Sequence, residues 1–202
     1  MDTKSLVYSR NVVEFATVAK EYCAFLENAQ DHTRKSFINA AHKLLPLLYY
    51  KASVLPEVQP LLDDSNEKFV DEEIYENIRT KLLALFGQYD EFLEVNDIRA
   101  KEGEGVFVAN NSEYLSDIYQ DLKNFTILFQ VGSVDVMNDA LWECKSNFEE
   151  FWGIRLANTI RSLHNLFYSD TELDKQDDKP VKDEPDTSQW FIAQRQKDFP
   201  IE

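Results

Sequence analysis

Apolar residues recur at every third or fourth position through most of this chain, a spacing that places them on one face of an α-helix. With 5 glycines and 6 prolines in 202 residues, the chain also has little of the turn-forming sequence that a sheet-rich fold needs. We therefore predict an all-α fold, an antiparallel bundle of about five main helices that occupies residues 1–168.

The predicted helices are separated by polar or proline-containing connections. Pro46 lies inside the second helix, and proline lacks a backbone donor and clashes with the carbonyl four residues earlier, so we expect a kink or a break there. Gly153 is a position at which the last helix can bend. The five stretches are residues 5–28, residues 33–54, residues 71–93, a fourth that Asn111 or Ser112 caps and Gly132 ends, and residues 136–168.

Two connections are long. Residues 54–71 follow the second helix, and residues 94–111 contain a polar, glycine-rich run. The second of these is predicted to be a loop in which Val106, Phe107 and Val108 form an extended segment.

The C-terminal part of the sequence changes character. Residues 169–186 carry eight acidic side chains against three lysines, together with two prolines, and this composition predicts a solvated acidic linker. Aromatic residues then return in residues 187–202, as Trp190, Phe191 and Phe199. We expect this tethered segment to dock on the bundle, on a sister chain or on a partner.

Charge and apolar content limit the partners. A formal net charge of -16 disfavours binding to nucleic acid and to anionic membranes. No apolar run approaches the ~20 residues that span a bilayer, and the sequence that follows Met1 does not resemble a signal peptide. Cys23 and Cys144 fall on apolar helical stripes, so we expect both to be buried free thiols. Free thiols fit a reducing compartment. We expect a cytoplasmic protein, a monomer or a homodimer, with no nucleic-acid or membrane partner.

The sequence contains no catalytic or cofactor-binding signature. His32, His42 and His164 lack the glutamate three residues earlier that di-iron bundles use. Phosphate-binding glycine loops and Cys-x-x-Cys pairs are also missing. We therefore predict no catalytic residue, no metal site and no cofactor.

One polar constellation on the last two predicted helices stands out. Its members fall at helical spacing, so that carboxylates on one helix can face an arginine on the other. The pattern fits an exposed face or an internal salt bridge that fixes the helix register, and it also fits a groove for a peptide or a small polar ligand. The residues are Tyr114, Asp117, Asp121, Arg155, Thr159 and His164.

Three segments of the sequence form a recognisable set. They are Tyr8-Ser9-Arg10-Asn11-Val12-Val13-Glu14-Phe15 with Glu21-Tyr22-Cys23, Leu44-Leu45-Pro46-Leu47-Leu48-Tyr49, and Phe151-Trp152-Gly153-x-Arg155-Leu156. These segments resemble an uncharacterised bacterial family, the one catalogued as domain of unknown function 5063. The resemblance covers residues 5–168, and it implies a bacterial cytosolic helical protein without an assigned activity.

Two functions remain open at this level. The first is a non-enzymatic adaptor module that binds a protein or peptide through a helical groove, which fits the aromatic-rich helices, the acidic surface and the tethered aromatic segment. The second is a bundle enzyme that binds a metal or a small ligand in the neighbourhood of Asp117, Asp121, Arg155 and His164.

Overall fold

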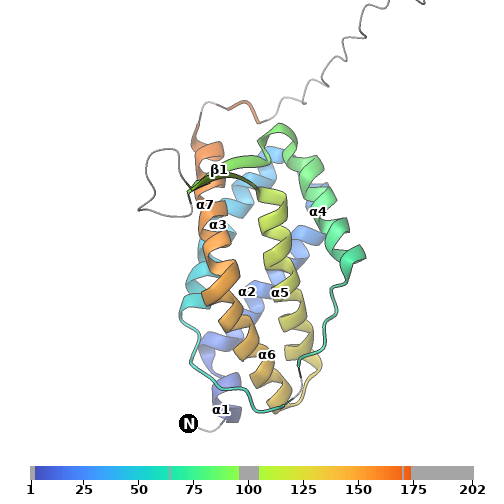
Figure 1. Cartoon of the computed structure of the whole chain (residues 1–202), viewed down its shortest axis with the longest axis vertical. Coiled ribbons are helices and arrows are strands. Elements are labelled where there is room, and N and C mark those ends of the chain that lie inside the picture. The colour runs from blue at the N-terminus through green and yellow to red at the C-terminus, as the bar shows by residue number, and fades with distance from the viewer. Residues whose placement is uncertain (1–2, 64, 96–104, 170, 174–202) are drawn as a thin grey trace, which may run out of the picture.

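Residues 3–63, 65–95, 105–169 and 171–173 are described by the computed structural model, which is a helical bundle with a short β-hairpin at one end (Figure 1). The segment that contains Trp190, Phe191 and Phe199 lies outside the described residues, as does most of the acidic linker. The elements in chain order are α1 (Thr3–Val7), α2 (Arg10–Glu27), η1 (Ala29–Asp31), α3 (Arg34–Ser53), α4 (Glu72–Phe86), η2 (Gly87–Tyr89), β1 (Glu91–Val95), β2 (Val106–Asn110), α5 (Asn111–Val131), α6 (Val134–Asn147), η3 (Phe148–Trp152) and α7 (Gly153–Tyr168).

Helix α5 lies at the centre of the bundle, in contact with α2, α4, α6 and α7, while α3 packs along α7. The predicted apolar stripes form the core: Phe15, Leu48, Leu122 and Leu156 are fully buried, and Leu85 packs against them while partly exposed. The all-α prediction is confirmed for the bundle, because the stripes of the helices face one another across a shared interior.

The second predicted helix is not broken at its proline. Helix α3 continues through Pro46, which is exposed, while its neighbours Leu45 and Leu48 are buried. Proline deprives the carbonyl of His42 of its helical donor. Burial of the flanking leucines holds the helix together across this position.

The third predicted helix ends earlier than its apolar spacing indicates. Asp71 caps the start of α4 by accepting a hydrogen bond from the backbone N–H of Ile74 (2.9 Å). The helix ends at Phe86 because Gly87 adopts φ 55°, a left-handed conformation that glycine tolerates. Phe92 and Leu93, which the spacing assigned to this helix, lie in strand β1 instead.

Residues 91–95 and 106–110 form an antiparallel hairpin, so the prediction of a loop at this place is only partly correct. The extended segment Val106–Val108 is confirmed as part of β2, and Leu93 pairs with Val108. The hairpin leads directly into α5 and lies across the end of the bundle beside α7 (Figure 1).

The last predicted helix is interrupted by a π-helical turn, η3, between α6 and α7. Gly153 follows this turn, and a Cβ atom at this position would overlap the carbonyl oxygen and ring of Phe148. The extra residue of a π-turn rotates everything after it. The apolar face of α6 therefore packs against α5 and α1, whereas the apolar face of α7 packs against α3 and α5.

The long connection between α3 and α4 runs over α5 and α6 and is attached to them by buried side chains. Asn138 donates a hydrogen bond to the carbonyl of Gln59 (2.7 Å). Backbone N–H groups of the connection donate to carboxylate or amide oxygens at 2.7–3.1 Å: Leu61 and Leu62 to Asp139, and Phe69 and Val70 to Asn124. Polar residues of the two helices thus fix a segment that has no regular structure.

Candidate functional site

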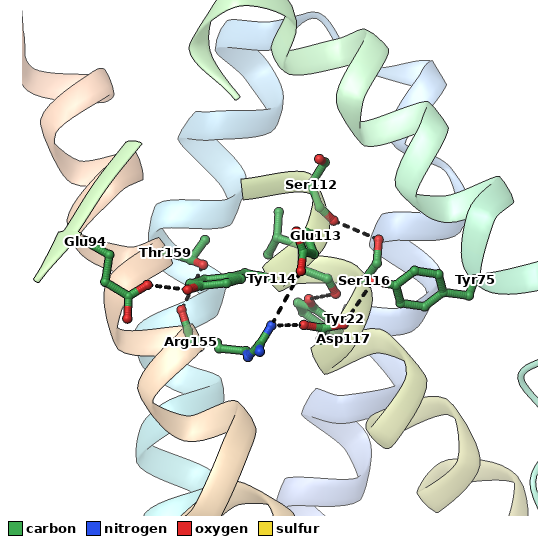
Figure 2. Close-up of polar contacts among 11 residues, drawn as sticks. Tyr22, Tyr75, Glu94, Ser112, Glu113, Tyr114, Ser116, Asp117, Arg155 and Thr159 are labelled. Atoms are coloured by element: carbon green, nitrogen blue, oxygen red, sulfur yellow. Dashed lines mark hydrogen bonds and ion pairs between the residues drawn. The ribbon is translucent and has the colours of Figure 1, made fainter. Parts of the chain in front are cut away.

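An ion pair between Asp117 of α5 and Arg155 of α7 lies at the centre of the predicted polar constellation (Figure 2). Tyr75 of α4 donates a hydrogen bond to the other oxygen of Asp117 (2.9 Å), and Glu113 lies 4.0 Å from the arginine. Burial raises the pKa of Asp117, while Tyr75 and Arg155 oppose this shift. Both oxygens of the carboxylate are therefore occupied by partners from neighbouring helices.

Aromatic rings enclose the guanidinium of Arg155. Its carbon lies 4.2 Å from the ring centroid of Phe151 and 4.8 Å from that of Tyr114. Cations over ring faces are attracted by the ring quadrupole. Arg155 is therefore held on several sides, and its side chain serves to join α5 and α7.

A second set of polar contacts joins the bundle to the hairpin. Glu94 of β1 is 5% exposed, and it accepts hydrogen bonds from the hydroxyl of Tyr114 and from the side chain of Asn158 (2.8 Å). Burial and the hydrogen bond to Glu94 both raise the pKa of Tyr114. A buried carboxylate without these donors would be costly, so the contacts fix the inner face of the hairpin on α5 and α7.

The six predicted residues do not form one cluster. Tyr114, Asp117 and Arg155 come together, and the Thr159 hydroxyl donates to the carbonyl of Arg155 within α7 (2.9 Å). Asp121 lies one turn along α5 and accepts a hydrogen bond from Asn147 (2.7 Å). His164 is exposed, and its ring lies against that of Tyr168. Of the readings that the sequence left open, the structure favours an internal salt bridge at Asp117.

The start of α5 is capped from outside the helix, which the sequence did not predict. Neither Asn111 nor Ser112 caps the helix with its own side chain. Buried Asp90, just before β1, accepts hydrogen bonds from the backbone N–H and the hydroxyl of Ser112 (both 2.7 Å), and from the side chain of Asn110 (3.1 Å). A carboxylate at a helix N-terminus is favoured by the helix dipole. Asp90 therefore fixes both ends of the hairpin on α5.

Between β1 and α7 lies an open groove of about 420 Å³. Tyr89, Phe92, Leu93 and Leu166 give it apolar walls, and among the described residues that line it Glu91 and Arg161 are the charged ones. A groove with one charge of each sign differs from the acidic surface that the net charge of -16 implies. Apolar grooves with few polar groups are typical of binding sites.

The edge of β1 that borders this groove has backbone groups that β2 does not use. The N–H of Asn111 donates to the carbonyl of Asp90 (2.9 Å), so Asp90 directs its backbone towards the β2 side. Successive residues of a strand direct their N–H and C=O groups to alternate edges. Glu91 and Leu93 therefore direct theirs to the groove, where Arg161 donates to the carbonyl of Leu93 (2.5 Å).

The outward face of the hairpin is apolar. Leu93 is 63% exposed, its cross-strand partner Val108 is 58% exposed, and Val106 is 44% exposed. The sequence signal for this hairpin was present, in two short apolar segments on either side of a polar, glycine-containing run. This signal was overlooked because Phe92 and Leu93 also continue the helical spacing of the apolar residues before them.

Within the described part of the chain, no group of three or more His, Cys, Asp or Glu side chains is placed to hold a metal ion. The helices of the same residues include none that is long and apolar enough to cross a membrane. Cys23 and Cys144 are buried as predicted, and burial raises the pKa of the Cys23 thiol to about 12.

The fold and site define a helical-bundle protein with a hairpin attached across one end. Residues 6–169 match the model of the family described as domain of unknown function DUF5063, and the chain belongs to this family. The crystal structure of protein BF1032 from Bacteroides fragilis is similar, with 43% sequence identity and a TM-score of 0.75. The match covers 83% of this chain and 98% of that one. Among curated proteins there is no match.

Proposed function

We propose that this protein is a non-enzymatic binding module that takes up an extended peptide segment in the groove between β1 and α7. The observation that carries the proposal is the outer edge of β1, where Glu91 and Leu93 direct backbone groups that β2 does not use into an apolar groove, and where the side chain of Arg161 bonds the carbonyl of Leu93. A strand that borders an open groove can be extended by an added strand, whose main chain supplies affinity and whose side chains supply specificity.

The groove defines the chemistry of its occupant. An added strand places alternate side chains against the walls, where Tyr89, Phe92 and Leu166 offer aromatic and aliphatic contacts. The carbonyl groups of the added strand would lie near the guanidinium of Arg161, which in this structure donates to the main-chain carbonyl of Leu93. The preferred occupant is an extended segment with aromatic or β-branched side chains and no net charge.

The alternative of a metal- or ligand-binding enzyme has less support. It requires Asp117, Asp121, Arg155 and His164 in one neighbourhood, whereas Asp121 contacts Asn147 and His164 faces solvent. The carboxylate of Asp117 and the guanidinium of Arg155 already form an ion pair with each other.

The test is a selection of displayed 12-residue peptides on a chain that ends after Leu173. Such a chain is expected to fold, because it keeps residues 6–169, which match the family model, and because the match to the crystallised Bacteroides fragilis protein covers 98% of that chain but 83% of this one. Selected peptides should lose at least ten-fold in affinity for the Leu93→Lys variant. Proline placed at alternate peptide positions should abolish binding in only one register, because only alternate N–H groups meet β1.

Val13→Lys is the matched control. Val13 is 44% exposed and lines a separate groove of about 530 Å³ between α2 and α5, far from β1 in sequence. This variant should bind the selected peptides as the unmodified chain does. If no peptide is enriched, or if Leu93→Lys and Val13→Lys behave alike, the proposed site is wrong.

A further inference from the structure

We infer that the occupant of the β1–α7 groove includes the chain's own segment 187–202, which binds in cis and competes with other peptides. This inference rests on the proposed function of the groove. Three observations support it: the point at which the chain leaves the bundle, the length of the intervening sequence, and the match between the segment and the groove.

The chain leaves the bundle beside the groove. Ser169, directly after α7, is one of the groove's lining residues. Leu173, the last described residue, is 7% exposed and belongs to the core cluster. The sequence that follows therefore starts from a fixed point at the same end of the bundle as β1 (Figure 1).

The intervening sequence is long enough to reach the groove and short enough to keep the segment close. Residues 174–189 separate Leu173 from Trp190. A solvated linker of this length has an end-to-end distance of roughly 22 Å. Short linkers of this kind give effective concentrations on the order of 1 mM. Weak binding of the segment, with a Kd of about 0.1 mM, would fill the groove most of the time.

The segment has the chemistry that the groove selects. Trp190, Phe191 and Ile192 are consecutive residues that favour extended structure, and residues 187–194 carry no charged side chain. By contrast, residues 169–186 carry eight acidic groups, which favour solvent over an apolar groove that contains Glu91. Alternation along a strand would direct Trp190 and Ile192 to one side and Phe191 to the other.

Competition gives the expected size of the effect. With a local concentration of about 1 mM and a Kd of about 0.1 mM, the full chain should bind a selected peptide about ten-fold more weakly than the chain that ends after Leu173. The double substitution W190A and F191A in the full chain should restore the affinity of the shortened chain. Substitution of Phe199 alone should have a smaller effect, because it lies outside the uncharged run.

The experiment measures peptide affinity for these chains and also maps the contact directly. A photo-cross-linking amino acid at position 93 of the full chain should form an intramolecular cross-link to peptides from residues 187–202, identified by mass spectrometry. The same group at position 13 should not. Cross-links in a species of twice the chain mass would overturn binding in cis, as would equal peptide affinity of the full and shortened chains.

The outcomes separate this inference from the proposed function. If selected peptides bind the shortened chain at β1 but bind the full chain equally well, the groove is a binding site and the inference about residues 187–202 is wrong. If peptides bind neither chain at β1, the proposed function is wrong, and this inference, which rests on it, is wrong as well.

Discussion

The substitution Asp121→Asn should stabilise this protein at neutral pH. Asp121 lies on α5 beside a small, partly open pocket, where it accepts a hydrogen bond from Asn147 (2.7 Å) and lies near Glu143 and Lys68. Burial raises the pKa of Asp121 to about 6, with Glu143 adding to the shift and Asn147 and Lys68 opposing it. An unperturbed aspartate has a pKa of about 3.9.

The sign and size follow from proton linkage. Because the folded pKa is the higher one, the folded state binds the proton more tightly, and ionisation of Asp121 costs stability. The cost is complete above pH 6 and disappears as the pH falls from about 6 towards 4. A difference of about 2 between the two pKa values corresponds to about 3 kcal/mol at pH 7. Asparagine keeps an acceptor for Asn147 and carries no charge, so the substitution should recover most of this free energy of unfolding.

The assay is thermal and urea unfolding of both proteins at pH 7, 6, 5 and 4. The variant should unfold about 4–12 °C higher at pH 7, and the difference should shrink steadily towards pH 4. Glu21→Gln, which removes an exposed carboxylate from α2, is the control and should show almost no difference at any pH. A variant that is less stable at pH 7, or a difference that does not depend on pH, would refute the reasoning.

Three further substitutions probe features that position the hairpin and the bundle. Gly153→Ala should destabilise the protein by about 1–3 kcal/mol in urea unfolding, because the new Cβ overlaps the backbone of Phe148, whereas alanine is otherwise the better helix former. Asp90→Ala should cost about 2–4 kcal/mol and speed hydrogen exchange at the start of α5, because Ser112 loses its acceptor. Asp139→Ala should speed protease cleavage near residue 62 at least several-fold with little change in helix content by circular dichroism, because two backbone N–H groups lose their acceptor.

The helices could be predicted from the sequence because burial between helices imposes its own period on apolar residues. The caps Thr33, Asp71 and Ser133 are local as well, since each side chain bonds to an N–H three residues ahead, although the sequence alone also allows Asp31 in place of Thr33 and Asp135 in place of Ser133. Such contacts are local, and the sequence contains both partners side by side.

The remaining features depend on partners that are distant in sequence. Phe92 continues the apolar spacing of α4, and only the conformation of Gly87 and the pairing with Ala109 turn it into a strand. Helical spacing placed Asp117 and Asp121 on one face, but it could not show that Arg155 pairs with the first and Asn147 bonds the second. The groove was missed for the same reason, because it exists only once the hairpin has formed.

The π-turn η3 makes this chain sensitive to its length at one place. Loss of a single residue from the exposed pair Glu149–Glu150 would restore ordinary α-helical geometry, and it would rotate α7 by about 100° relative to α6. Arg155 would then turn away from Asp117, and Leu163 would leave the core. Related proteins should therefore tolerate substitutions at the exposed pair Glu149–Glu150 but neither insertions nor deletions in this turn.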